Sequence, residues 1–373
     1  MGKSKPLRVP QRLFSGANCP DNSRMMEKQL WHPVLASSEV RDVPVGLELL
    51  GEAVVLWREP GHEGAPGVVH AWADRCPHRG AKLSLGRVLL HLHGARLECP
   101  YHGWQFAGDA AAASGGGCAR CLHVPAAPEF VAPAGHRATV FEARECHDLV
   151  WVRLSAPDAA WPAELTEPPD FAPWTDSAWR SLLCGPYEVA TSAPRLVENF
   201  LDLSHFGFVH EGWLGARSHA QVETGQVQEG AHRLQANDCK AWQPQAYAGA
   251  ADGAWIAYRY TVPHPFAAIL RKDATEGDPV SNAIALFIRP GGAERCTAWF
   301  AMATLGDRSE DEALRRFQDT VFAQDRPVVE SQTPKRLPIG LDGPVRELHS
   351  PVDRMSSAYR RYLSRLGVSL GVC

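Results

Sequence analysis

The sequence predicts a two-domain α+β protein in which an all-β module precedes a domain that mixes strands with helices. The chain has 373 residues, and at about 100 to 200 residues per domain this length accommodates two cores. Short apolar segments separated by glycine and proline dominate the first part, whereas strand-like and helical segments both occur in the second. The proline-rich stretch Ser155–Trp174 separates the two patterns. We therefore expect a module at 26–155 and a second domain at 156–373.

Composition and charge exclude several classes of protein. Hydrophobic residues make up 45% of the chain, and 38 basic residues nearly balance 42 acidic ones, for a net charge of −4. This excludes wholesale disorder and gives no electrostatic case for nucleic acid or an anionic membrane as partner. No apolar run is long enough to span a membrane, because Glu48, Gly51 and Glu52 interrupt the segment Val45–Trp57. We therefore expect a soluble protein.

The N-terminus and the cysteines indicate a cytoplasmic location. The ten cysteines could form five disulfides, but the first 30 residues carry no apolar run or cleavage site of the kind that a secretory signal needs. We therefore expect reduced thiols in a cytoplasm. Residues 1–25 are polar and lack helical periodicity, which predicts a flexible tail.

The elements of the first module follow from its turn residues. Strands are predicted at Glu52–Trp57, Val68–Ala73, Leu97–Cys99 and Leu149–Leu154. The run Gly108–Cys121 is rich in alanine and glycine and has no hydrophobic period, which predicts a surface loop. Its Cys118 and Cys121 form a C-x-x-C pair without the βαβ context of a redox motif, so we give them no function.

The second domain is predicted to combine strands with two helical segments. Strands are expected at Ala254–Val262, Ala283–Ile288 and Cys296–Leu305. The segment Val197–Trp213 is apolar and compatible with a helix. A second helix is predicted at Ser309–Val329, with Ser309 as its N-cap and acidic residues in its first turn.

Two short loops of the first module each carry one cysteine and one histidine. They read Cys76-Pro77-His78-Arg79-Gly80 and Cys99-Pro100-Tyr101-His102-Gly103-Trp104. Proline and glycine fix tight turns and leave backbone N–H groups free to face a bound group. Two thiolates and two imidazoles can bind one zinc ion, or a [2Fe–2S] cluster with both thiolates on one iron and both imidazoles on the other. The residue types alone leave both possibilities open.

The two loops closely resemble the signature of the Rieske [2Fe–2S] proteins, including the proline after each cysteine and the Gly-Trp pair after the second histidine. The resemblance implies that Cys76 and Cys99 hold one iron and that His78 and His102 hold the other. It disfavours zinc, whose sites do not require the flanking proline, glycine and tryptophan. The interval from His78 to Cys99 exceeds the commonest Rieske spacing by a few residues, and we expect the excess in an enlarged loop at Val88–Ala95.

A second constellation lies in Glu198–His210, where one acid and two histidines stand in an otherwise apolar helical segment. Asp202 and His205 share a helical face, but His205 and His210 lie about 140° apart on an ideal helix with about 100° per residue. They can meet at one ion only if the helix distorts, which we expect near Gly207. The alternative is a pair of hydrogen-bonded core histidines.

This segment resembles the D-x-x-H-x4-H motif of the Rieske non-haem iron oxygenases. Position by position, the resemblance implies that His205 and His210 are iron ligands in a 2-His-1-carboxylate triad. It further implies that Asp202 bridges two metal centres and that Asn199 lies near the site. The fold it implies for the second domain is an antiparallel sheet with helices, of the helix-grip type.

The third iron ligand is predicted to be Asp325. Projection at about 100° per residue puts one apolar stripe on the helix, formed by Leu314, Phe317, Val321 and Val328. Asp325 falls at its edge, where a carboxylate is costly unless it is paired or binds metal, whereas Asp319 and Glu330 project to the opposite face. The stretch 321–332 also resembles the ligand segment of the family branch that includes caffeine N-demethylase and dicamba O-demethylase. The residues around the other candidates, Asp319 and Asp353, do not show this pattern. The alternative is a surface aspartate beside an arginine.

The resemblance implies a terminal oxygenase. Its cluster would receive electrons from NAD(P)H through a separate flavin or iron–sulfur reductase or a ferredoxin, and its mononuclear Fe(II) would use O2 as co-substrate. The demethylase-like segment favours monooxygenation of an N-methyl, O-methyl or aryl-methyl carbon of a small aromatic or heterocyclic substrate. Aromatic ring hydroxylation or cis-dihydroxylation is the alternative. The family also implies a homotrimer in which each Rieske centre serves the neighbour's iron.

Other features of the chain carry less weight. No G-x-G-x-x-G follows a predicted strand, so nicotinamide is expected on the reductase. Asn282 and Phe287, on a strand expected to wall the pocket, are candidate substrate contacts. From other classes, a Rieske electron carrier without oxygenase activity and a zinc-binding structural protein remain alternatives.

Overall fold

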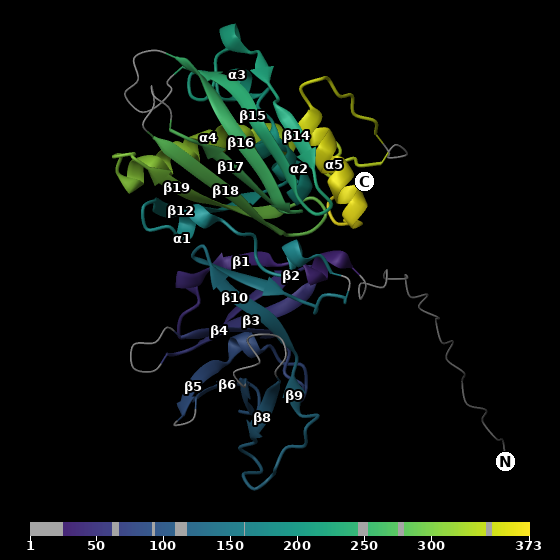
Figure 1. Ribbon diagram of the computed structural model, residues 1–373. Coiled ribbons are helices and arrows are strands. Elements are labelled where there is room, and N and C mark those ends of the chain that lie inside the picture. The colour runs from purple at the N-terminus through teal and green to yellow at the C-terminus, as the bar shows by residue number, and fades with distance from the viewer. Residues whose placement is uncertain are drawn as a thin grey trace, which may run out of the picture.

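The computed structural model describes residues 25–61, 67–91, 94–108, 118–159, 161–244, 253–274, 280–340 and 345–373. The predicted N-terminal tail and most of the predicted loop at 108–121 therefore lie outside the described residues. Two bodies of antiparallel sheet are stacked along the long direction of the molecule (Figure 1). No helix in the described part of the chain has the length and apolar character needed to cross a membrane.

The N-terminal body consists of two antiparallel sheets. The first has the order β1 (His32–Ala36), β11 (Leu149–Arg153), β10 (Val140–Cys146), β4 (Val68–Ala73), β3 (Glu52–Glu59) and β2 (Val45–Leu49). The second has the order β5 (Arg87–His91), β6 (Gly94–Glu98), β7 (Gln105–Gly108), β8 (Ala119–His123) and β9 (Arg137–Ala138). The predicted strands in this part are confirmed. Their apolar residues form the two cores of this body.

Two predicted loops of the N-terminal body are wrong in part. Val88–Ala95 is not an enlarged loop, because Val88 pairs with Leu97 and Leu90 with Ala95 in the β5–β6 hairpin. The C-terminal part of the predicted loop at 108–121 belongs to β8, where Cys121 is buried in the core and its thiol donates a hydrogen bond to the carbonyl of His123. In β6 and β8 buried and exposed residues alternate, so these strands are longer than the apolar runs from which they could be predicted.

The C-terminal body is one large antiparallel sheet, with the three longest helices on one face and the short helix α1 (Ala172–Thr175) on the other. Its strand order is β12 (Arg180–Val189), β19 (Cys296–Leu305), β18 (Ser281–Pro290), β17 (Ala267–Lys272), β16 (Ala254–His264), β15 (Leu234–Gln243) and β13 (Val222–Glu223), with β14 (Gln226–Glu229) also paired to β15. The helices are α1 (Ala172–Thr175), α2 (Ala193–Leu201), α3 (Phe206–Val209), α4 (Asp311–Ser331) and α5 (Arg354–Leu366). The predicted α+β fold, with an all-β body before it, is confirmed.

The two faces of the large sheet have different neighbours. One face packs against α2, α4 and α5 around an extensive apolar core. The other packs against the N-terminal body, where Trp31 and Trp151 meet Phe287 and Trp299. The two bodies are further joined by Arg289, which donates a hydrogen bond from its guanidinium to the carbonyl oxygen of Val34.

His147 lies within this junction and makes it sensitive to acid. Its ring stacks on Phe287 at 5.0 Å and meets Trp151 and Trp174 edge-on. Burial lowers the pKa of His147 to about 4, against a weaker raising effect of Asp170. The unfolded chain therefore binds a proton between pH 6.5 and 4 that the folded chain does not, so stability is highest above pH 6.5 and is lost as pH falls through this window.

We expect His147→Phe to flatten the acid dependence of stability. Between pH 7 and pH 5 the free energy of unfolding should fall by about 2 kcal/mol more in the unmodified protein than in the variant, as the shifted pKa requires. Urea denaturation followed by tryptophan fluorescence at the two pH values measures the difference. Equal falls in both proteins would show that His147 is protonated alike in the folded and unfolded chains.

Candidate metal centres

The two cysteine–histidine loops have the same backbone construction. The N–H of Cys76 donates to the carbonyl of Ala81, and the N–H of Gly80 donates back to the carbonyl of Cys76. Cys99 makes the corresponding pair of hydrogen bonds, accepting from Gly103 and donating to the carbonyl of Trp104. Gly80 and Gly103 have φ of 74° and 68°, in the left-handed region that favours glycine. Cys-Pro and a glycine four residues after the cysteine occur in both loops, and they build two matching turns.

The four candidate cluster ligands are brought together with thiols inside and imidazoles outside. Cys76 and Cys99 are 1% and 2% exposed, and their thiols are close enough to influence each other's ionisation. His78 and His102 are exposed, with ring centroids 4.7 Å apart. The ring of His78 also stacks on Trp104 at 4.4 Å. Burial raises the pKa of Cys76 to about 11, so a positively charged group has to face these sulfurs before both become thiolates.

The spread of these donors suits a binuclear cluster better than a single zinc ion. A tetrahedral zinc ion with bonds of about 2.0 to 2.3 Å holds its donors within about 4 Å of one another. In the described part of the chain, the four side chains do not form a group whose ligand atoms all lie within 4.8 Å. Two sulfurs facing each other, with two imidazoles beyond them, match a [2Fe–2S] group that has one pair of ligands on each iron.

The second constellation is built around a break between α2 and α3. α2 ends at Leu201, and Asp202 has extended backbone angles of φ −90° and ψ 131°. The carboxylate of Asp202 accepts a hydrogen bond from the N–H of Ser204 at 2.7 Å, a local turn that competes with helix continuation. His205 then begins α3 and His210 follows its end. The predicted distortion near Gly207 is wrong in position, because the helix is interrupted at Asp202.

α4 supplies the carboxylate, although with a different buried face from the one predicted. Its buried residues are Gln318, Phe322, Asp325 and Val329, whereas Phe317 and Val328 of the predicted stripe are 38% and 44% exposed. The helix begins after Glu310, which makes no side-chain cap, so the predicted cap at Ser309 is also wrong. It continues through Pro327 to Ser331. Asp325 nevertheless lies on the buried face.

His205, His210 and Asp325 converge, and their ligand atoms all lie within 4.8 Å of one another. The two Nε2 atoms are 3.2 Å apart, and Asp325 Oδ1 lies 3.4 Å from Nε2 of His205 and 3.2 Å from Nε2 of His210. His210 is 1% exposed and Asp325 8%. Two imidazoles and one carboxylate at such distances match the donor set of a facial triad.

The electrostatics of this group are those of a cation site. Burial by itself raises the pKa of Asp325, but hydrogen bonds from His205 and His210 outweigh it and hold the pKa at about 2. Burial lowers the pKa of His205, and hydrogen bonds to Asp202 and Asp325 reverse this and raise it to about 9. The carboxylates therefore hold positive charge on His205, a charge that a bound metal ion would supply in its place.

Each member of the group has a partner of its own. Asp202 Oδ2 lies 3.2 Å from Nδ1 of His205, and Asn199 donates to Asp325 Oδ1 at 3.3 Å. The sequence reasoning placed both residues near the site. It missed Gln324, whose Oε1 lies 2.8 Å from Nδ1 of His210. Its position immediately before Asp325 is the feature of the sequence from which it could have been predicted.

Of the two predicted substrate contacts, one lies on the wrong face of the sheet. Phe287 is fully buried between His147 and Trp151, in the junction with the N-terminal body. Side chains alternate along a strand, so Asn282 shares the opposite face with Ile284, which packs against the helix-side core. Asn282 lies at the start of β18, paired with Lys272 and Thr304.

Aromatic residues pack near the triad on the helix side of the sheet, and the ring of Phe206 lies next to those of His205 and His210. Phe200 of α2 meets Tyr260 and Phe300 edge-on or tilted, and Phe206 meets Tyr258. Tyr260 is 2% exposed, and among the described residues its hydroxyl has no hydrogen-bond partner. A buried hydroxyl without a partner is costly, so this group is available to a bound molecule. The sequence reasoning missed Tyr260 because a tyrosine in a strand is ordinary core.

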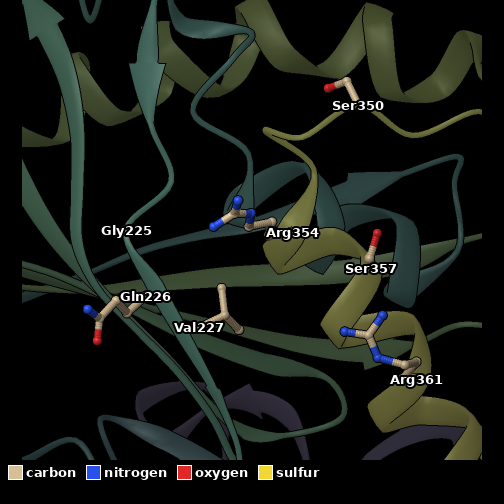
Figure 2. A pocket seen from close by; sticks show the side chains of 7 residues that line it. All are labelled: Gly225, Gln226, Val227, Ser350, Arg354, Ser357 and Arg361. Carbon is tan, nitrogen blue, oxygen red and sulfur yellow. The ribbon is translucent and has the colours of Figure 1, made fainter.

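Two surface pockets lie away from both centres. One of about 530 Å³ separates Gln226 and Val227 of β14 from Arg354 and Arg361 of α5 (Figure 2). The other, of about 940 Å³, lies at the junction of the two bodies. None of the candidate metal ligands lines either of them.

The two centres lie at opposite ends of the chain's fold. The first cysteine–histidine loop follows β4 and the second follows β6, both strands of the lower body in Figure 1, whereas α3 is at the upper end. The large sheet and the first N-terminal sheet lie between them.

The chain is similar to known proteins along most of its length. Residues 30–128 match the Rieske [2Fe–2S] domain, and residues 189–368 match the vanillate O-demethylase oxygenase C-terminal domain. Methylxanthine N1-demethylase NdmA of Pseudomonas putida is 31% identical over 358 residues, which cover 93% of this chain and 91% of NdmA. The oxygenase component of dicamba O-demethylase from Stenotrophomonas maltophilia is 33% identical over 197 residues, 52% of this chain and 49% of its own. The structure of P. putida NdmA with caffeine has a TM-score of 0.73 at 30% identity and covers 92% of both chains.

Proposed function

Because the chain belongs to the Rieske non-haem iron oxygenases, we propose that it oxidises the methyl carbon of an N-methyl or O-methyl group on a small aromatic or heterocyclic substrate. The observation that carries the proposal is the convergence of His205, His210 and Asp325 in a chain that is 31% identical to an N-demethylase. Oxidation of such a carbon gives a hemiaminal or hemiacetal that collapses to formaldehyde. We propose the same domain division as before, near residue 155.

The residues present fit the two groups that this chemistry needs. Cys76, Cys99, His78 and His102 would hold the [2Fe–2S] cluster. The triad would hold Fe(II), which supplies oxygen activation through the positions that three protein ligands on one face leave open. The relatives named as oxygenase components support a separate reductase as the source of electrons from NAD(P)H. The exposed edges of His78 and His102 give those electrons a short path to the cluster.

A homotrimer is proposed because the two centres of one chain are far apart in the fold. Each cluster would then serve the triad of a neighbouring subunit. Asp202 suits the contact point, since its side chain is 33% exposed and each of its oxygens, one bound by Ser204 and one by His205, can accept a further hydrogen bond. A histidine of the neighbour's cluster would donate to the exposed part of that carboxylate, which would join the centres by hydrogen bonds.

Replacing Asp202 with asparagine is expected to slow electron transfer between the centres without loss of either metal. The amide keeps the size of the side chain but removes the charge that His205 and a second imidazole would share. Metal analysis should give unchanged iron, and single-turnover oxidation of the reduced cluster should be slower by about 10-fold or more, the range for removal of a residue that orients ligands. An unchanged rate would exclude Asp202 as the bridge.

The aromatic residues near the triad favour a flat, mostly apolar substrate. Phe200, Phe300 and Tyr258 offer aromatic surface, and Tyr260 offers one hydroxyl without a partner in the described residues. A substrate with a ring and one buried polar atom would satisfy both features. Asn282 stays a proposed contact at the far end of the same face.

Formaldehyde release tests the proposed reaction. The full-length protein, supplied with a generic ferredoxin and reductase, is offered a panel of N-methyl, O-methyl and ring-unsubstituted aromatics. Formaldehyde in step with NADH oxidation supports demethylation, whereas products that gain oxygen without formaldehyde support ring hydroxylation or cis-dihydroxylation. Cluster reduction without any product would leave the electron-carrier alternative. We propose a cytoplasmic location, which the free thiols of all nine described cysteines support.

A further inference from the structure

The ring of His210 is held in place by a contact that the triad itself does not provide. His210 follows the short helix α3, with irregular backbone angles of φ −110° and ψ 33°. Its side chain is 1% exposed. Nδ1 lies 2.8 Å from Oε1 of Gln324, and Nε2 lies 3.2 Å from the carboxylate of Asp325. The two ring nitrogens therefore face different residues of the same turn of α4.

A hydrogen bond to Nδ1 decides which nitrogen can bind a metal. A neutral imidazole carries one proton, so if a metal ion takes the place of the Nε2–H contact with Asp325, the remaining proton has to lie on Nδ1. The amide oxygen of Gln324 can accept a hydrogen bond but cannot donate one, so it requires the proton of the ring to be on Nδ1. Because the side chain of His210 is only 1% exposed, water has little access to replace the amide as its partner.

The two histidines of the triad are oriented by different kinds of group. His205 faces the carboxylate of Asp202, which is 33% exposed and adds negative charge. His210 faces the neutral amide of the half-buried Gln324, next to the carboxylate of Asp325. An amide can orient the ring without bringing a second buried anion to the helix turn that already carries Asp325.

We propose that Gln324 is a positioning residue of the mononuclear centre. Its Oε1 accepts a hydrogen bond from Nδ1–H of His210 and so holds the ring in the tautomer that binds metal through Nε2. The proposal rests on the proposed function, because it assumes that His210 is a metal ligand. α4 then contributes both a ligand, Asp325, and the orienting group of a second ligand from adjacent positions. A displacement of this helix would disturb two of the three ligands at once.

Metal affinity of four variants tests the assignment. Full-length protein with its Rieske cluster is freed of mononuclear iron, and Co(II) binding is measured by equilibrium dialysis with metal analysis. Gln324→Met keeps the length of the side chain but removes the acceptor, and we expect affinity to fall by about 10- to 100-fold. Gln324→Glu restores an acceptor and should return affinity to within a few-fold of the unmodified protein. Ala323→Leu, on the exposed neighbouring position of α4, should change nothing.

The outcomes separate this assignment from the proposed function. Loss of Co(II) in His210→Ala together with full binding in Gln324→Met would overturn the role of Gln324 alone. Full binding in His210→Ala would overturn the proposed centre itself. Equal losses in Gln324→Met and Gln324→Glu would also overturn the assignment, because packing or a donated hydrogen bond would then explain the effect. An unchanged far-ultraviolet circular dichroism spectrum in each variant shows that both bodies are folded. If Gln324→Met does not fold, Gln324→Glu still tests the need for an acceptor.

Discussion

Replacing Asp325 with alanine is expected to abolish turnover and leave the Rieske absorption spectrum unchanged. The carboxylate is one of three groups whose ligand atoms converge within 4.8 Å, and a site left with two imidazoles has no anion to balance a dication. Residues that only orient a ligand cost about 10- to 100-fold in metal affinity, so loss of a ligand should cost more than about 100-fold. Iron analysis per subunit, with the cluster quantified by its spectrum, measures the loss directly.

Asp319→Ala is the matched control on the same helix. Its carboxylate accepts a hydrogen bond from the hydroxyl of Tyr187 at 2.5 Å and lies outside the group of convergent ligand atoms. The variant should therefore keep its mononuclear iron, although the lost hydrogen bond costs about 1 kcal/mol of stability. Turnover retained in Asp325→Ala and lost in Asp319→Ala would mean that the wrong aspartate has been identified.

The features that the sequence predicted well are those whose determinants lie close together along the chain. Cys-Pro followed by a glycine four residues after the cysteine specifies a turn, and the two turns have the same pair of backbone hydrogen bonds. The strands β4 and β19 were predicted to the residue, because apolar runs with clear turn signals at both ends define them.

The features that it predicted poorly depend on contacts between distant segments. The exposed side of α4 carries Phe317, whose ring lies 5.7 Å from that of Trp213, so an apolar stripe in sequence is not the buried face in the fold. Phe287 was placed on the wrong side of β18 because alternation shows that two faces exist, but not which body covers each. Gln324 and His210 are 114 positions apart, and no pattern in either segment indicates that they pair.

The interruption of the helix at Asp202 shows how local chemistry can override a pattern. The apolar period continues through this position and predicts a helix, but the aspartate side chain binds the N–H of Ser204 and the helix ends. The same carboxylate then reaches His205. One residue therefore both breaks the helix, which brings His205 and His210 together, and presents the charge proposed to link the centres.

Mixed oligomers of two inactive variants are expected to recover about a third of native turnover, if electrons cross between subunits in a head-to-tail trimer. Cys99→Ala subunits would lack the cluster and keep the triad, and Asp325→Ala subunits would lack the iron and keep the cluster. Co-expression with two different affinity tags, followed by purification on both, isolates rings that contain both kinds of subunit. Each such ring has one junction, of three, at which an intact cluster faces an intact triad, whatever its composition.

The value expected from this experiment follows from geometry and not from the rate of any step. Electron transfer within a subunit would give no turnover, because every subunit lacks one centre, and this would refute the cross-subunit route. Recovery of no doubly tagged protein would refute the oligomer itself. Rings that pair Asp325→Ala with subunits carrying both substitutions serve as the control, since no triad remains in them and turnover has to be absent. Recovery near a third would place the functional unit at the junction of two chains, where the exposed side of Asp202 and the exposed rings of His78 and His102 would meet.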